Sequence, residues 1–331
     1  MSAYSLLDLS QVPVPDIIET LDFEVIFKDL KQQLININTQ HAQVLNLESE
    51  PLTQVLQTFA YRELLLRAQL NDVTRANMLA SATGHDLEAI GARYNVKRLV
   101  KGPFELTGGS ENEPASETPQ GLIQESDTNF RRRIQMAFNG LNTAGSEGSY
   151  IFHGLSSDPQ VLDIDVTSPE PCEIVMTILS TLSEQNPSGI PNDILLANVR
   201  AYFGLSSDGS GVKKTYSLEE AKRLHKIRPL GDRLTIKAVD VQEYQVEAVL
   251  WVLPGVGKDE ILIKAKQSIH RYAQNRHKLG KKISLSGLYS ALHQEGIEQV
   301  QLTLPTNDIE VAHDQVAFCT HYTVTAEELH E

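Results

Sequence analysis

The feature that most constrains the fold of this chain is a long run of helical periodicity that begins at Pro51. Apolar residues recur every three or four positions from there to Ala82, and proline suits the first turn of a helix. A helix over 51–82 would be roughly 45 Å long, whereas helices in compact domains average ~11–12 residues. Such a helix typically runs along a bundle or a coiled coil. Its apolar stripe consists of Leu52, Leu56, Phe59, Leu66, Leu70 and Val73.

Two kinds of surface could cover this stripe. One is an intramolecular core, for which the preceding residues offer one or two companion helices, the first ending near Leu34. The other is a partner chain, which we favour because flanking positions widen the apolar face: Val55, Ala60, Leu64 and Leu65. Glu63 and Asn77 lie in the same register, where a polar residue can fix the alignment of a bundle. We expect Gly84 to end the helix as a C-cap.

After this region the chain alternates short helices and strands. The fold class is therefore predicted as α+β, with an N-terminal long-helix region for an inter-subunit bundle followed by two tandem small α+β modules. The predicted parts are a helical region (1–95), a strand and loop linker (96–125), a central module (126–232) and a C-terminal ring-forming module (233–331). Residues 204–228, rich in Gly and Ser at their start, are predicted as a surface insertion that ends in a short basic helix near Leu218–His225.

Within the modules, the pattern predicts a helix capped by Ser126 that carries Phe130, Ile134, Ala137 and Phe138 on one side. Each module has a helix, a short helix that begins at Ser or Gly, and a strand that ends in proline, which suggests a tandem repeat. The predicted strands cover 97–107, 161–167, 172–180, 234–237, 244–253, 300–304 and 318–324, and further helices cover 146–153, 191–203, 258–278 and 284–293.

Composition excludes several classes of protein. The chain has 331 residues, with 29 Lys and Arg against 43 Asp and Glu, for a net charge of −14. Binding to duplex DNA depends on cationic charge, so a general DNA coat is excluded. Residues 1–11 carry no Lys or Arg and resemble no signal peptide, and no apolar run reaches the ~18 residues that span a bilayer. Cys172 and Cys319 are expected to be small buried apolar side chains of a protein made in a cytoplasm.

The sequence offers no strong catalytic motif, cofactor fingerprint or metal-ligand spacing. Asp163 and Asp165 share one face of a predicted strand and could present two carboxylates, but an exposed strand face is the better interpretation. His270 and His277 are two turns apart on one helix, too far for a shared metal without a third ligand. We favour a solvated helix face for them. The prediction is a protein that is not an enzyme and holds no cofactor or metal.

The distribution of charge is uneven. Residues 213–282 contain 16 of the 29 Lys and Arg, so the rest of the chain is strongly acidic. An ordinary solvated helix face is one interpretation. The other is an electropositive surface that docks an acidic neighbouring copy or partner. Nucleic acid is a weaker alternative, because no aromatic residues are interleaved for stacking. The candidate interface residues on the helix from Lys258 are Lys266, Arg271 and Lys278.

Several short segments, collinear over nearly the whole chain, resemble one known family. They include ESEPL at 48–52, AYREL at 60–64, GHDLEAIGARYN at 84–95, ESDTNFRRRIQ at 125–135, AGS at 144–146 and VTSP at 166–169. The resemblance continues with RPLGDRLT at 228–235, LGKKI at 279–283, YSALHQEG at 289–296 and AFCT at 317–320. This combination resembles baseplate assembly protein J, the baseplate J-like family of contractile-tailed bacteriophages and R-type tailocins.

The resemblance implies a structural role. It implies a wedge component of a contractile-tail baseplate that joins a second copy of itself, baseplate protein I and a protein W-like wedge protein through N-terminal helices. It also implies that C-terminal modules link neighbouring wedges into a sixfold ring around the tail tube, where baseplate change is coupled to sheath contraction. The implied location is a virion or tailocin tail baseplate, assembled in the host bacterial cytoplasm, without membrane insertion or nucleic acid. A non-infectious contractile injection system is the first alternative, and an enzyme or a nucleic-acid-binding module is a more distant one.

Overall fold

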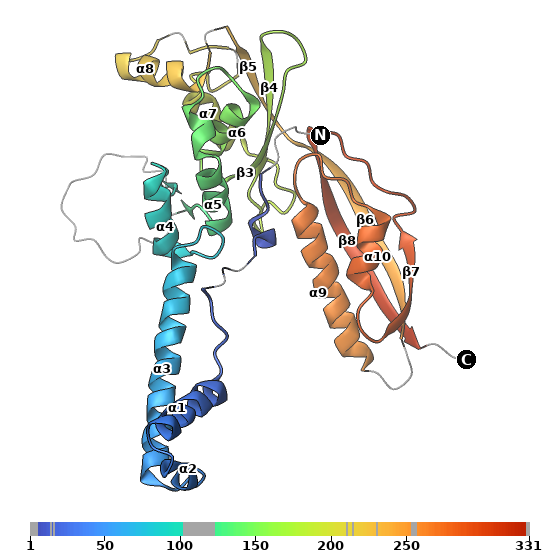
Figure 1. Cartoon of the computed structure of the whole chain (residues 1–331). Coiled ribbons are helices and arrows are strands. Elements are labelled where there is room, and N and C mark those ends of the chain that lie inside the picture. Colours follow the sequence, from blue (N-terminus) through green and yellow to red (C-terminus); the bar gives the residue numbers. More distant parts are fainter. Residues whose placement is uncertain are drawn as a thin grey trace, which may run out of the picture. The chain divides into compact units, whose positions relative to one another are not determined.

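A computed structural model describes residues 6–13, 15, 17–101, 123–209, 211–213, 215–229, 231–252 and 257–328. The chain divides into two compact units, one over Leu6–Lys97 and one from Arg98 onward (Figure 1). The first is helical, and the second combines helices with two three-stranded sheets. The prediction of an α+β fold with N-terminal helices is thereby confirmed.

The N-terminal unit is built on one long helix. Its elements are η1 (Leu9–Gln11), α1 (Phe23–Ile37), α2 (His41–Val44), α3 (Pro51–Ala76) and α4 (Gly84–Arg93). Asp22 caps α1 by accepting hydrogen bonds from the amides of Glu24 and Val25. In Figure 1 α1 lies against the α2-proximal part of α3, and a small core of Ile26, Phe27 and Ala60 joins these two helices.

The long helix ends earlier than its periodicity predicts. α3 stops at Ala76, where both the backbone and the side-chain amide of Asn77 donate to the carbonyl of Val73 and a turn follows. Ser81 stabilises this turn by donating to the carbonyl of Arg75. The prediction that Gly84 ends the helix is wrong: Gly84, with a φ of +52°, is the first residue of α4. The apolar periodicity predicted a helix end that is too late, because the turn residues 78–82 are mostly apolar themselves.

The central part of the second unit is a mixed sheet, with helices that precede its strands or connect them along the chain. It contains β1 (Val100–Lys101), β2 (Ile123–Gln124), α5 (Asp127–Gln135), η2 (Ala137–Leu141), α6 (Glu147–Leu155), β3 (Val161–Thr167), β4 (Glu173–Ser180), α7 (Asp193–Tyr202), α8 (Leu218–Ile227) and β5 (Arg233–Ala238). The sheet order is β3-β4-β5, with β4 antiparallel to β3 and parallel to β5. Ser126 and Ser146 cap α5 and α6 through their hydroxyl oxygens.

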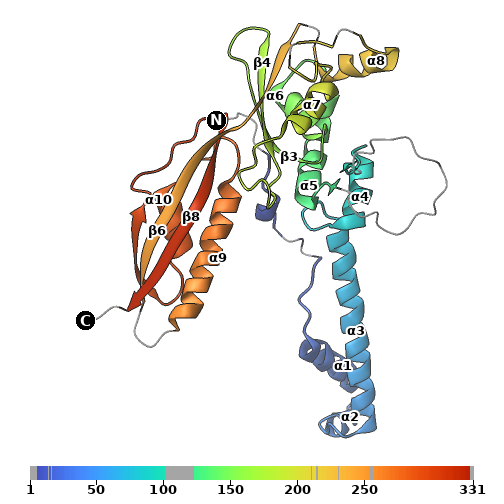
Figure 2. The same cartoon turned by 180° about the vertical axis from the view of Figure 1, so that it is seen from behind.

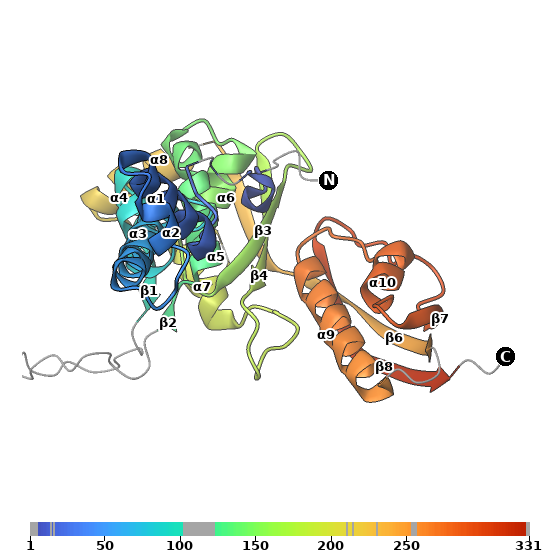
Figure 3. The same cartoon turned by 60° about the horizontal axis from the view of Figure 1, so that its bottom comes forward.

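The C-terminal part is a two-layer structure. It contains β6 (Asp240–Val252), α9 (Lys258–Arg276), α10 (Leu285–Leu292), β7 (Ile297–Leu304) and β8 (Gln315–Glu328). The sheet order is β7-β6-β8, and Figure 2 shows β6 and β8 side by side along most of their length. Both helices lie on the same side of this sheet (Figure 3), where they share its apolar core.

The two sheets are similar in architecture but not in chain order. Each has a central strand with one antiparallel and one parallel neighbour. The central strand is β4 in the first sheet, after β3, whereas in the second sheet it is β6, which precedes both of its neighbours. The helix-helix-strand series α5-α6-β3 and α9-α10-β7 follows the predicted pattern, but the different strand orders argue against a simple tandem repeat.

Three local predictions are wrong. Phe138 does not continue the apolar side of α5, because the chain changes to the 3-10 helix η2 and leaves this side chain 72% exposed. Cys172 is exposed, at a turn where its φ is +66°. The segment 204–228 is not purely a surface excursion: α8 buries Leu224 and Ile227. The predicted strand 97–107 is represented by β1, and its residues 102–107 lie outside the described part of the chain.

Candidate assembly surfaces

The most prominent candidate surface is an uncovered apolar face of α3. Phe59 is 61% exposed, and Leu66, Leu70 and Val73 are 62%, 61% and 61% exposed. At about 100° per residue these four side chains lie within about 60° of one another around the helix. We call them the α3 face. A contiguous exposed apolar patch of this kind is typical of an interaction surface.

The predicted stripe is divided between two environments. Leu56 is partly buried against the core that α1 and α3 share, and Leu52 is also half-buried near the start of the helix. The intramolecular and intermolecular interpretations therefore each describe part of α3. The first turns are covered by α1, and the α3 face beyond them is open in the described unit.

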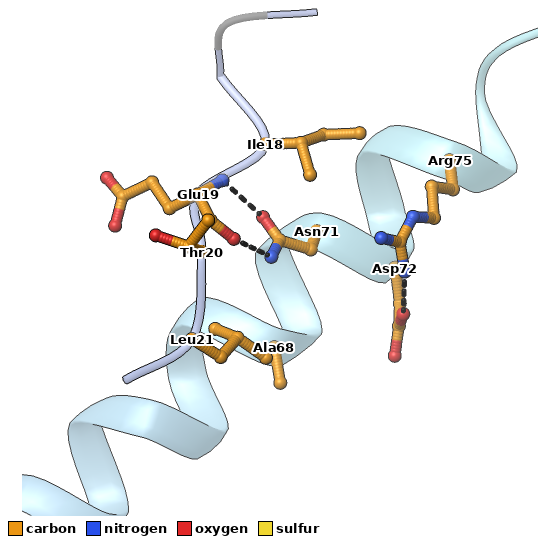
Figure 4. Close-up of a pocket in the computed structure, with 8 residues that line it drawn as sticks. All are labelled: Ile18, Glu19, Thr20, Leu21, Ala68, Asn71, Asp72 and Arg75. Carbon is orange, nitrogen blue, oxygen red and sulfur yellow. Dashed lines mark hydrogen bonds and ion pairs between the residues drawn. The ribbon is translucent and has the colours of Figure 1, made fainter. Parts of the chain in front are cut away.

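A polar clamp holds the extended residues before α1 against α3. The buried side chain of Asn71 accepts a hydrogen bond from the Glu19 amide at 3.2 Å and donates to the Glu19 carbonyl at 2.9 Å (Figure 4). Arg67 bridges the carboxylates of Glu63 (2.6 Å) and Glu19 (2.8 Å). Glu63, predicted to fix the register of a bundle, is thus engaged within the unit. These segments line a pocket of about 510 Å³.

The cations of α9 and of the residues just after it differ in their partners; Arg276, the last residue of α9, lies over the ring of Tyr272 at 5.6 Å. Lys258 and Lys264 have carboxylate partners on their own chain, Glu328 at 3.0 Å and Glu260 at 2.7 Å. The predicted interface residues are different: they are exposed, and no ion pair joins them to another described residue. They are Lys266, Arg271 and Lys278.

The predicted carboxylate pair on β3 is buried, contrary to expectation. Asp163 is 7% exposed and accepts hydrogen bonds from Arg132 (2.8 Å) and from the backbone amide of Leu279 (3.2 Å). Asp165, also 7% exposed, contacts the His313 imidazole at 3.1 Å. Burial raises the pKa of Asp165, although His313 opposes this effect. The two carboxylates therefore join the central sheet to the C-terminal part of the same unit.

The prediction of a solvated helix face holds for one of the two histidines: His270 is exposed, whereas His277, just after α9, is buried. His277 is 5% exposed and its Nδ1 lies 3.0 Å from the carbonyl of Ala317. Burial lowers the pKa of His277. His270 is exposed and contacts the hydroxyl of Tyr322 at 3.0 Å. The two rings thus serve separate internal contacts.

Sequence reasoning missed a buried ion pair at the start of the second unit. Glu125 and Arg133 contact each other at 2.6 Å, with side-chain exposures of 2% and 5%. The Glu125 carboxylate also accepts a hydrogen bond from the Leu99 amide at 3.0 Å. Glu125 precedes the Ser126 cap and Arg133 lies near the end of α5, and no periodicity indicates burial of these two charged residues. Their role is to hold β1 and α5 together.

The described residues also bear on metal binding and on membrane insertion. No group of three or more His, Cys, Asp or Glu side chains there could hold a metal ion. None of the described helices is both long enough and apolar enough to cross a bilayer.

Comparison with known proteins connects these surfaces to one family. Residues 48–105 match the Baseplate J-like N-terminal domain, and residues 244–325 match the Baseplate J-like protein C-terminal domain. The chain is also 39% identical over 324 residues to Baseplate protein J of Escherichia phage P2, covering 96% of this chain and 97% of that protein. A chain in the cryo-EM structure of the anti-feeding prophage baseplate aligns with 14% identity and a TM-score of 0.36, over 61% of this chain and 46% of that one. The first match contains α3 with its uncovered face, and the second contains α9. On the identity and coverage shared with the phage P2 protein, the chain belongs to the Baseplate J-like family.

Proposed function

We propose that this Baseplate J-like protein is a structural wedge component of a contractile-tail baseplate. The 39% identity to Baseplate protein J of phage P2 over nearly the full length of both chains carries this proposal. In the proposed assembly, the chain joins a second copy of itself, baseplate protein I and a protein W-like wedge protein. Neighbouring wedges then form a sixfold ring around the tail tube, in a virion or a tailocin assembled in the host bacterial cytoplasm.

The α3 face supports the wedge contact on physical grounds. Phe59, Leu66, Leu70 and Val73 each expose about three fifths of their surface in the described unit. Water contact with such side chains is unfavourable by roughly 25 cal/mol per Å² of apolar surface, so partner helices that cover them gain free energy. The face continues along α3 beyond the turns that α1 covers, and α3 alone exceeds the typical length of a globular helix.

The exposed cations on α9 and just after it support the ring contact. A ring closed by rotation requires heterologous contacts, in which one surface of a subunit meets a different surface of the next. Lys266, Arg271 and Lys278 present a cationic surface on a chain whose net charge is −14. We expect them to approach acidic surface of an adjacent copy and to influence register and assembly rate more than final stability.

The proposed role is structural, without catalysis, cofactor, nucleic acid or membrane insertion. The residues that the sequence offered for chemistry are engaged in internal contacts. Asp163 and Asp165 join two parts of one unit, and His277 is buried against Ala317. Alanine substitution at these positions should therefore affect folding rather than any turnover. A catalytic activity of the purified protein that is lost with Asp163→Ala, while the fold is retained, would contradict the structural role.

Co-expression of the full chain with the neighbouring tail proteins of its particle tests the proposal. We expect a stable complex that contains two copies of this chain with protein I-like and W-like partners, measured by light scattering coupled to size exclusion and by mass spectrometry. A chain that elutes alone, with each partner folded and present, would refute the wedge role.

A further inference from the structure

The C-terminal sheet has one face that no described helix covers. Tyr244, Val246, Ala248 and Leu250 of β6 belong to the core beneath α9 and α10. Because side chains alternate along a strand, Glu247, Val249 and Trp251 point to the opposite face. In Figure 3 both helices lie on one side of this sheet, and the described chain places no helix on the other. Trp251 is the only tryptophan of the protein.

This uncovered sheet face combines an apolar centre with negative charge. Val249 and Trp251 are half-buried on the central strand. Glu327 of β8 lies directly opposite Trp251 in the strand register, and Glu247 lies four residues before it on β6. The other neighbours of Trp251 and Val249 in the register are uncharged, namely Gln299, Gln301 and Thr325. We call this surface the sheet face.

Beyond its first turn, which carries Asp259 and Glu260, the outward side of α9 has the complementary composition. Ile261, Ala265 and Ile269 face the core, so Ile263, at 56% exposure, lies on the opposite side of the helix. Lys266 and Arg271 flank Ile263 on the two sides of that outward ridge, since the helix turns about 100° per residue. We call this surface the helix face. It presents one exposed aliphatic side chain between two cations that lack an ion pair in the described structure.

The distance between the apolar and the charged residue is similar on the helix face and on the sheet face. Ile263 and Arg271 are eight residues apart, or ~12 Å along a helix. Trp251 and Glu247 are four residues apart, or ~13 Å along a strand. A helix face that lies along β6 with Ile263 on Trp251 therefore brings Arg271 to Glu247. Lys266, ~4.5 Å farther along the helix axis than Ile263, is then within reach of Glu327 beside Trp251.

We propose that the helix face of one copy docks on the sheet face of the next copy. The two faces lie on opposite sides of the same module, so the contact is heterologous and can continue from subunit to subunit, as ring closure requires. Tryptophan and arginine are the residue types most often central to protein interfaces. This inference rests on the proposed baseplate function and assigns the acidic surface that the cations of α9 meet.

Charge exchange between two forms of the full chain tests the pairing. One form carries Lys266→Glu with Arg271→Glu, and the other carries Glu247→Lys with Glu327→Lys. Each form alone, co-expressed with the wedge partners, should associate between wedges about tenfold more weakly at low salt, because both pairs become repulsive. An equal mixture should restore ring assembly, since copies can alternate around a ring of even number. Lys222→Glu with Lys226→Glu on α8 changes the net charge by the same amount as the first form and should have no effect.

Cross-linking provides the second measurement. In a background with Cys172→Ser and Cys319→Ser, which removes both native thiols, Lys266→Cys with Glu327→Cys should yield a ladder of covalent oligomers beyond dimers when assembled rings are treated with a short bis-maleimide. Each single-cysteine variant should yield none. Dimers from Glu327→Cys alone would instead show a sheet-to-sheet contact and overturn the proposal.

Failure of the docking contact and failure of the baseplate function give different results. The docking of the helix face on the sheet face is wrong if the wild-type chain forms wedges and rings but the double-cysteine variant gives no cross-linked ladder. It is also wrong if the equal mixture of charge-reversed forms does not restore ring assembly. If wild-type chain forms no complex with tail proteins, the baseplate function is wrong and the docking inference falls with it.

Discussion

Replacement of two residues of the α3 face should abolish wedge assembly without unfolding the protein. The perturbation is Phe59→Asp with Leu66→Asp, at side chains that are 61% and 62% exposed in the described unit. Complete burial of one such side chain contributes about 1.5–3 kcal/mol. Because about three fifths of each remains to be covered, a partner helix gains about 1–2 kcal/mol per residue.

The sum over the face sets the expected size of the effect. Four residues with this exposure correspond to about 4–7 kcal/mol of apolar burial. Loss of two of them removes about 2–4 kcal/mol, or roughly 30- to 700-fold in affinity, before the cost of placing two carboxylates in an apolar seam. The thermal unfolding of the isolated chain should change little, since neither side chain belongs to the core of Ile26, Phe27 and Ala60.

The assay is the yield and size of wedge complexes from co-expression, with unfolding of the purified chain measured in parallel. The matched control is Gln54→Asp with Thr58→Asp, which adds the same charge at exposed positions on another side of α3. Leu56→Asp serves as a contrast, because Leu56 packs against the core shared with α1 and its change should destabilise the unit itself. Normal wedge yield from the Phe59 and Leu66 double variant would refute the assignment of the α3 face.

Three further outcomes follow from particular contacts. Reversal of Lys266, Arg271 and Lys278 to Glu should slow ring closure at low salt, with less effect at high salt, while the wedge bundle still forms. Equal assembly at both salt levels would show that these residues only face solvent. Burial lowers the pKa of His153 to about 4 from its ordinary 6.5. The unfolded chain therefore binds a proton at His153 more readily than the folded chain does. The free energy of unfolding is highest above pH 6.5 and should be about 2 kcal/mol lower at pH 5. His153→Gln should reduce that loss in thermal unfolding curves, and an unchanged pH dependence would contradict the assignment to His153. Glu125→Leu should cost about 3–5 kcal/mol in urea unfolding by removing the carboxylate that the buried Arg133 guanidinium contacts at 2.6 Å, whereas Glu125→Leu with Arg133→Met should cost less. A double variant no more stable than the single one would show that the ion pair is not the cause.

Local elements were determined well by the sequence because their signals are local. The hydroxyls of Ser126 and Ser146 cap the helices that follow them, as their positions before apolar runs predict. β3 spans Val161–Thr167 as predicted, since alternation and β-branched residues mark a strand without reference to distant chain. The α3 face was also visible in sequence, because a stripe at helical spacing records which side of a helix is apolar.

The limits of α3 show where the local signal ends. Apolar periodicity continues into residues 78–82, yet the helix stops at Ala76 because the Asn77 side chain takes the carbonyl of Val73. The sequence likewise did not determine which residues of the apolar stripe on α3 are covered by another helix. Whether Leu56 or Phe59 meets α1 depends on the path of the chain between the two helices, and periodicity carries no information on that path.

Only the tertiary structure decided which charged residues are buried. Asp163 and Asp165 are polar positions on a strand, which in isolation favours an exposed face. They are buried because the amide of Leu279 and the imidazole of His313 reach them from 116 and 148 residues away. The Glu125–Arg133 pair and the uncovered face around Trp251 depend in the same way on packing between elements. The sequence pattern determines which side of each helix or strand is apolar. The tertiary structure determines which other element covers that side, because burial depends on neighbours that are distant in the sequence.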